Sequence, residues 1–78
     1  MPQLNENFLF NCVRKYNRAQ RQTQRDAILH AAAVHAQLPN VEKKRSPLPT
    51  LSAGERQATV DFLNQFLSDQ GVEVRIKS

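Results

Sequence analysis

The side chains best suited to ligand chemistry are arginines in the first third of the sequence, separated by four, three and four residues: Arg14, Arg18, Arg21 and Arg25. On one unbroken helix this spacing confines them to an arc of about 60°, opposite the apolar stripe. Guanidinium groups at this pitch repel one another, and only Asp26 is nearby to offset them, so an anionic ligand would stabilise the helix. The four arginines, with Lys15 and Gln22 as further hydrogen-bond donors, predict a surface that contacts phosphates or base edges. A solvated helix face is the alternative, since arginine is also a good helix former.

A second basic group, Lys43, Lys44 and Arg45, follows in a proline-containing stretch. It is interpreted either as a second phosphate-contact site or as ordinary exposed charge. Residues 14–45 hold eight Lys or Arg against two acidic residues, whereas the rest of the chain holds three against five. This asymmetry favours a polyanionic or acidic partner for the first half of the chain.

The histidines and the single cysteine do not form a recognisable reactive group. His30 and His35 are five residues apart, which on a helix separates them by about 140° and prevents them from sharing a metal. A partly buried, hydrogen-bonded imidazole is expected at His30, and a buried thiol at Cys12. The sequence offers no nucleophile with its base, no glycine-rich phosphate loop and no paired carboxylates. We therefore expect no enzyme activity, no metal site and no cofactor.

The first half of the chain has the periodicity of a helix. No Gly or Pro occurs between residues 3 and 38, and apolar positions recur every three or four residues. The stretch 6–37 is compatible with one long helix. The polar segment 17–24, in which Thr23 and Asp26 approximate a capping box, equally allows two helices.

Proline, glycine and helix-capping residues predict the structure of the second half of the chain. Pro39 should end the preceding helix near Leu38, and residues 39–52 are expected to form an exposed, basic, proline-containing loop. Ser52 and Glu55 form a capping box that predicts a helix over 53–68. Gly71 is placed to adopt a left-handed cap after it. The expected apolar face consists of Thr59, Val60, Phe62, Leu63, Phe66 and Leu67.

The C-terminal residues 72–78 alternate apolar and charged side chains, which is the period of a half-buried strand. No second strand is predicted, so this segment must pair with another chain or lie extended across the helices. The whole is expected to be one domain, residues 1–78. Its predicted class is all-α, a small bundle of two or three helices with a short extended C-terminal segment.

The sequence also gives expectations for the cellular location and the oligomeric state of the protein. No run of 18 apolar residues and no secretory leader is present, so we expect a cytoplasmic protein without a membrane partner. If 6–37 is one helix, its uncovered apolar stripe predicts a homodimer; if the chain turns within 17–23, a monomeric three-helix bundle can close.

Two functions are compatible with the charge pattern. The first is a nucleic-acid-binding accessory or regulatory protein that contacts DNA or RNA through the arginine ridge. The alternative is a small protein-interaction adaptor or inhibitor that docks on an acidic protein surface. An unpaired C-terminal strand that adds to a partner's sheet would favour the second.

Overall fold

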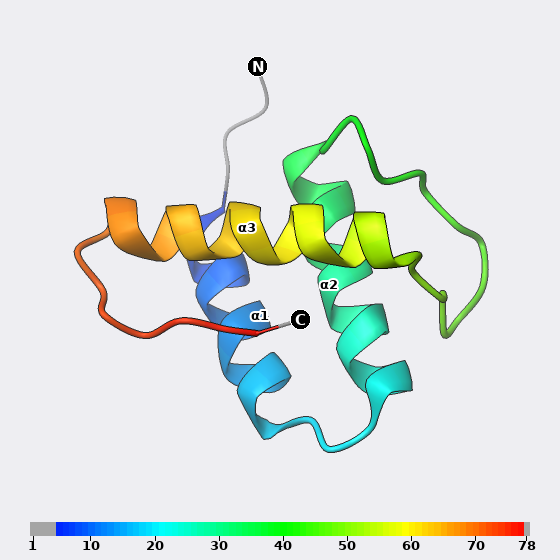
Figure 1. Ribbon diagram of the computed structural model, residues 1–78, viewed down its shortest axis with the longest axis horizontal. Helices are drawn as coiled ribbons and strands as arrows, with labels where there is room; N and C mark the ends of the chain where they lie inside the picture. Colours follow the sequence, from blue (N-terminus) through cyan, green and yellow to red (C-terminus); the bar gives the residue numbers. More distant parts are fainter. Residues whose placement is uncertain (1–4, 78) are drawn as a thin grey trace.

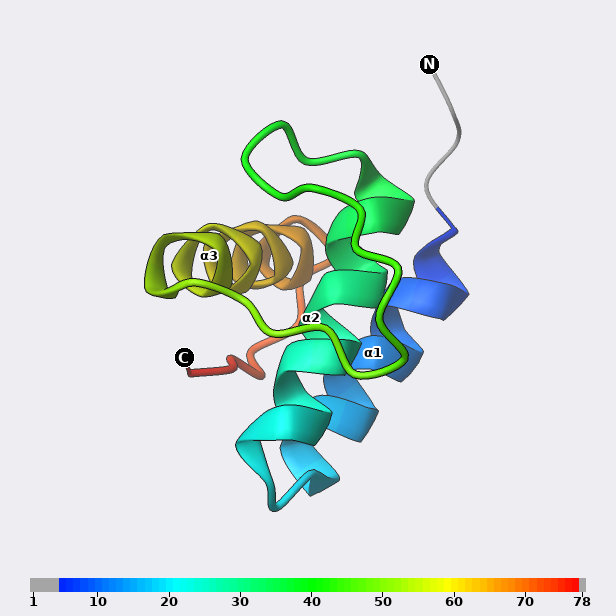
Figure 2. The ribbon, with the colours of Figure 1, turned by 90° about the vertical axis from the view of Figure 1, so that its right-hand side faces the viewer.

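The computed structural model describes residues 5–77, and this part of the chain contains three helices (Figure 1). They are α1 (Glu6–Arg18), α2 (Gln22–Ala36) and α3 (Ala53–Asp69). Helices α1 and α2 run side by side in opposite directions, and α3 crosses both of them on one side (Figures 1 and 2). This is the small all-α bundle predicted from the sequence. None of the described helices is long and apolar enough to span a membrane.

The first helical stretch is divided by a turn over residues 19–21. Ala19 and Arg21 have extended backbone conformations, which interrupt the helical hydrogen bonds. The turn falls within the polar segment 17–24, so the prediction of two helices is the one that holds. The predicted capping box is wrong. Arg21 is the N-cap residue of α2 and makes no side-chain capping bond, while Asp26 lies inside the helix and is buried.

The turn allows the apolar stripe of the first stretch to be buried within one chain. Leu9, Val13 and Tyr16 of α1 are at most 4% exposed, and Phe10 packs edge-on against Phe66 of α3. The homodimer prediction depended on an unbroken helix that left these residues uncovered, so its premise does not hold. The three-helix bundle of the alternative prediction is confirmed, and its monomeric state stays a prediction.

Helix α3 begins and ends as its local sequence predicts. The Ser52 hydroxyl accepts the Glu55 N–H, and the Glu55 carboxylate accepts the Ser52 N–H, which completes the capping box. Gly71 has a φ of 74°. On the expected apolar face, Phe62 is half-buried and the other five residues are buried.

The loop between α2 and α3 is tethered at both ends. Helix α2 ends at Ala36, slightly before the predicted end near Leu38, and Gln37 takes the left-handed conformation with φ 55°. Most residues of 39–52 are exposed, as expected. Val41, Pro49 and Leu51 are nevertheless buried and fix the path of the loop.

The C-terminal residues 72–77 form neither helix nor strand and lie on the α3 side of α1 (Figures 1 and 2). The Asn64 carboxamide imitates a neighbouring strand, because its Oδ1 accepts the Ile76 N–H at 2.9 Å and its Nδ2 donates to the Ile76 carbonyl at 3.0 Å. The Tyr16 hydroxyl donates to the Lys77 carbonyl. Ile76 is buried. These contacts satisfy both backbone groups of Ile76 and the Lys77 carbonyl without a partner's strand, and Ser78 lies outside the described residues.

Candidate nucleic-acid interface

The turn divides the predicted arginine ridge between two helices. Arg14, Lys15 and Arg18 are exposed on α1, and Arg21 is exposed in the turn. The four arginines therefore do not share the face of one helix, which is the arrangement that their spacing predicted. They are still close along the chain, because the turn between α1 and α2 is only three residues long.

Two of the predicted contact residues also have structural roles. The half-buried Arg25 lies over the Tyr16 ring, with its guanidinium carbon 5.6 Å from the ring centroid, and its Nε donates to the Ala19 carbonyl at 3.2 Å. Gln22 donates its amide to the Asp26 carboxylate at 2.8 Å. Arg25 therefore holds the turn against α1, and Gln22 helps to satisfy a buried carboxylate.

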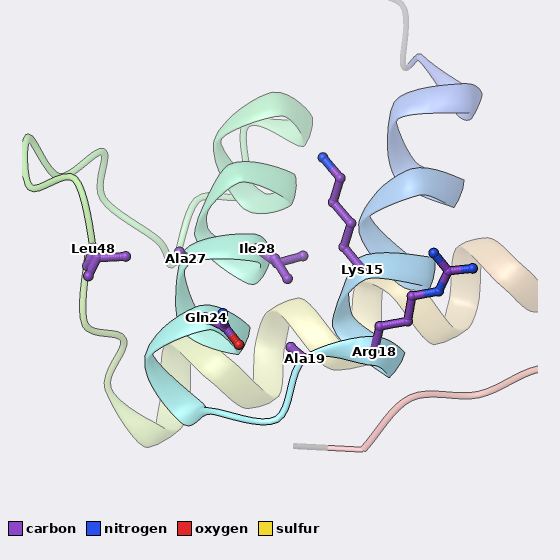
Figure 3. Close-up of a pocket in the computed structure, with 7 residues that line it drawn as sticks. All are labelled: Lys15, Arg18, Ala19, Gln24, Ala27, Ile28 and Leu48. Carbon is purple, nitrogen blue, oxygen red and sulfur yellow. The ribbon is translucent and has the colours of Figure 1, made fainter.

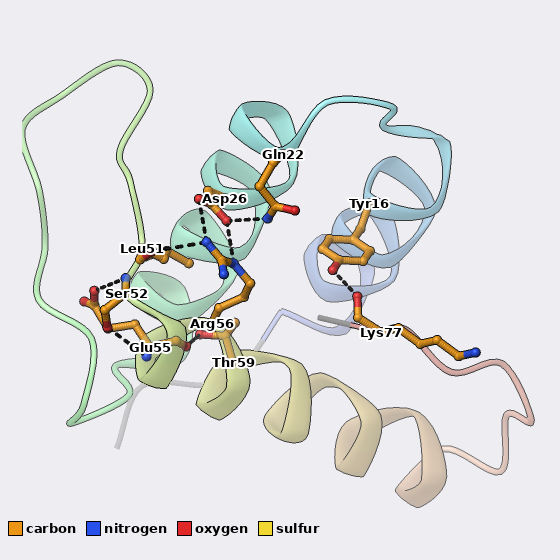
Figure 4. Close-up of polar contacts among 9 residues, drawn as sticks. All are labelled: Tyr16, Gln22, Asp26, Leu51, Ser52, Glu55, Arg56, Thr59 and Lys77. Atoms are coloured by element: carbon orange, nitrogen blue, oxygen red, sulfur yellow. Dashed lines mark hydrogen bonds and ion pairs between the residues drawn. The ribbon is translucent and has the colours of Figure 1, made fainter.

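A cationic hollow opens between the last turn of α1, the start of α2 and the C-terminal segment. It has a volume of about 360 Å³ and is lined by Tyr16, Asn17, Arg25, Arg75, Ile76 and Lys77. Three of these six residues are cations and none is acidic. Figure 4 shows the Tyr16 hydroxyl directed at the Lys77 backbone, a contact that holds the C-terminal segment beside α1. We call these three cations, Arg25, Arg75 and Lys77, the cationic end.

Asp26, which the sequence suggested would offset the arginines, is paired with Arg56 of α3 instead (Figure 4). Arg56 Nε and Nη2 donate to the two carboxylate oxygens at 3.0 and 3.2 Å, in a bidentate arrangement. Burial disfavours the charged form of Asp26, but the hydrogen bonds from Arg56 and Gln22 outweigh it and hold the pKa of the carboxyl below its usual value. The charge of Asp26 is thus already matched by a cation outside the cationic end.

The second basic group lies elsewhere on the surface. Lys44 donates its N–H to His30 at 3.0 Å, and its ammonium is 3.4 Å from the Glu55 carboxylate. The run 43–45 is therefore held beside the middle of α2 and the start of α3, away from the turn. Lys43 and Arg45 are exposed.

The remaining candidates, His30, His35 and Cys12, are hydrogen-bonded or buried within the fold. His30 is 9% exposed and hydrogen-bonded, as expected, and His35 accepts the Asn5 N–H at 2.9 Å. Cys12 is buried, and burial raises the pKa of its thiol, which disfavours the reactive thiolate. Within residues 5–77, no group of three or more His, Cys, Asp or Glu side chains is arranged to hold a metal ion.

A second concave surface lies between α1 and α2, on the face opposite α3 (Figure 3). One hollow of about 440 Å³ has Gln24, Ala27 and Ile28 of α2 as its floor, Lys15 and Arg18 of α1 with Ala19 of the turn on one side, and Leu48 of the loop on the other. A second hollow of about 260 Å³ shares Lys15, Ala27 and Ile28 with it and extends to Phe8. We call the two together the α1–α2 groove.

Sequence reasoning missed Arg75 and Lys77 as members of the site. The alternating pattern of the C-terminal segment placed them on its exposed side, but only the fold shows which helices lie opposite. The comparisons add no assignment: no protein-family profile, curated protein or solved structure matches this sequence.

Proposed function

We propose that the protein binds nucleic acid through backbone phosphates at its cationic end. The observation that carries this proposal is the hollow lined by Arg25, Arg75 and Lys77 without an acidic residue. Guanidinium and ammonium groups are the side chains that most often contact phosphates. Like charges brought together without a carboxylate repel one another, so an anionic ligand would stabilise this arrangement.

The surroundings of Tyr16 favour phosphate contacts over base stacking. Single-stranded nucleic-acid binders commonly stack bases on open aromatic faces. Here the Tyr16 side chain is 3% exposed and Arg25 lies over its ring. We therefore expect weak sequence preference and a strong dependence of affinity on salt concentration.

The proposal is tested by fluorescence anisotropy with labelled duplex DNA, single-stranded DNA and single-stranded RNA over a series of salt concentrations. The informative variant is Arg75→Gln with Lys77→Gln, which removes two cations from the hollow and leaves the Lys77 carbonyl in place. For duplex DNA, the slope of log affinity against log salt should become shallower by about two, because each lost phosphate contact contributes about 0.9.

The matched control is Lys43→Gln with Arg45→Gln. This pair lowers the net charge by the same amount, but both side chains are exposed and lie away from the cationic end. Its salt slope should stay close to that of the unmodified protein. The proposal fails if none of the three nucleic acids binds in a salt-dependent way, or if the two double variants weaken binding equally.

A further inference from the structure

We infer that the α1–α2 groove is a docking site for an acidic amphipathic helix of a partner protein. This goes beyond nucleic-acid binding and uses the face of the bundle opposite α3. The two hollows of the groove share Lys15, Ala27 and Ile28, so they form one continuous depression. Along α1 it extends from Phe8 to Arg18, roughly 15 Å at 1.5 Å per residue, which matches about three turns of a partner helix.

Apart from Gln24, the floor of the groove is apolar, and two of its residues are alanines. Ala31 is exposed, and Ala27 and Ile28 are half-buried. Small residues allow the backbone of a second helix to approach closely. At the margins, Leu48 is 59% exposed and Phe8 is 37% exposed. Apolar side chains gathered around a concave surface are typical of a protein-binding site.

The charges on the wall of the groove define the partner further. Lys15 and Arg18 of α1 are its charged side chains, and none of the residues that line either hollow is acidic. A helix with an apolar stripe would bury that stripe on Ala27 and Ile28 and place acidic side chains beside Lys15 and Arg18. A nucleic-acid backbone has no apolar surface to match this floor, so the groove favours a protein.

The bundle geometry is also compatible with a fourth helix at this position. Helix α3 covers one face of the α1–α2 pair, and the groove occupies the opposite face (Figure 3). A docked helix would complete a layer on the open side, in the way that an amphipathic helix fits a helical groove. Attraction between its carboxylates and the basic wall would speed association and fix its orientation.

The test is a fluorescence titration of the full chain with three labelled, helix-stapled peptides of identical length. The first has leucines on one face and glutamates flanking them, the second has lysines in place of the glutamates, and the third is a scrambled form of the first. The acidic amphipathic peptide should bind more tightly than either control by about tenfold or more.

Ala31→Trp fills the groove from an exposed position, and Ala53→Trp adds the same side chain at an exposed position of α3. We expect the first to weaken binding of the acidic peptide by about tenfold and the second to leave it unchanged. Lys15→Glu should weaken it by about fivefold and reduce its dependence on salt. Circular dichroism checks that each variant retains its helices.

Three results would overturn the inference. One is equal binding of the acidic, basic and scrambled peptides, including no binding of any. Another is an unchanged affinity in Ala31→Trp with its helices intact. The third is a wild-type protein that sediments as a dimer while Ala31→Trp sediments as a monomer, since the groove would then be occupied by a second copy. These results do not depend on the cationic end, because Ala31 lies outside it.

Discussion

Replacing Asp26 by Asn removes the charge of the carboxylate that links α2 to α3, while the size of the side chain is kept. The Asp26 side chain is 5% exposed and that of Arg56 is 24% exposed. Removing one partner of a buried ion pair costs about 3–5 kcal/mol. Arg56 is partly in contact with water and also donates to the Leu51 carbonyl at 3.3 Å, so we expect a smaller loss for Asp26→Asn, about 2–3 kcal/mol.

This loss is large relative to the stability of a chain of 78 residues, which is expected to be roughly 4–12 kcal/mol. Urea denaturation at neutral pH, followed by far-ultraviolet circular dichroism, measures it directly. Asp61→Asn is the control, because Asp61 is exposed and accepts a hydrogen bond from Gln57. A loss in Asp26→Asn that is within about 0.5 kcal/mol of the loss in Asp61→Asn would refute the assignment of the pair as a structural link.

The same ion pair predicts how stability depends on pH. In the folded protein the pKa of Asp26 lies below its usual value of 3.8, because the bonds from Arg56 and Gln22 outweigh the effect of burial. The stabilisation is therefore complete above the unfolded-state pKa and is lost as the pH falls through the folded-state pKa. Wild-type protein should lose more stability than Asp26→Asn between pH 6 and strongly acidic solution, as a urea series at each pH would show. Equal acid sensitivity would contradict this.

Three further predictions concern the backbone, the C-terminal segment and the oligomeric state. Gln37→Gly should raise the free energy of unfolding by about 0.5–1 kcal/mol, because Gln37 has a φ of 55°. Gly71→Ala should lower it by about the same amount, because Gly71 has a φ of 74° although there is space for a Cβ. Urea denaturation measures both changes, and shifts of the opposite sign would contradict these predictions. Asn64→Ala removes two hydrogen bonds to Ile76 and should accelerate tryptic cleavage after Arg75, measured by mass spectrometry, whereas an unchanged rate would show that the segment is held by other contacts. Sedimentation equilibrium at micromolar concentration should give a mass near 8.9 kDa, and a mass that rises with concentration would show self-association.

The parts of the fold that depend on neighbouring residues could be predicted from the sequence. Ser52 and Glu55 define the start of α3 through bonds between residues three apart, and Gly71 supplies the left-handed conformation after its end. The turn at residues 19–21 left no comparable signal. No Gly or Pro occurs there, and the apolar period continues across it, so local preferences allow one helix or two. Burial of Leu9, Val13 and Tyr16 within one chain favours the turn, and that is a tertiary effect.

The candidate site was only partly predictable for the same reason. The arginine spacing drew attention to the α1–α2 region, but the turn divided the ridge that this spacing implied. The pairing of Asp26 with Arg56 joins residues 30 positions apart. No spacing rule predicts that contact, nor the approach of Arg75 and Lys77 to Arg25.

The most direct test of phosphate binding at the cationic end is a two-dimensional ¹H–¹⁵N NMR titration with a short thymidine oligonucleotide at low salt. The largest shifts of the backbone amides are predicted at residues 16–18, at Arg25 and at residues 75–77, and they should be reversed by added salt. Shifts that are largest at residues 43–45, that are spread evenly over the surface or that are absent altogether would contradict the proposal.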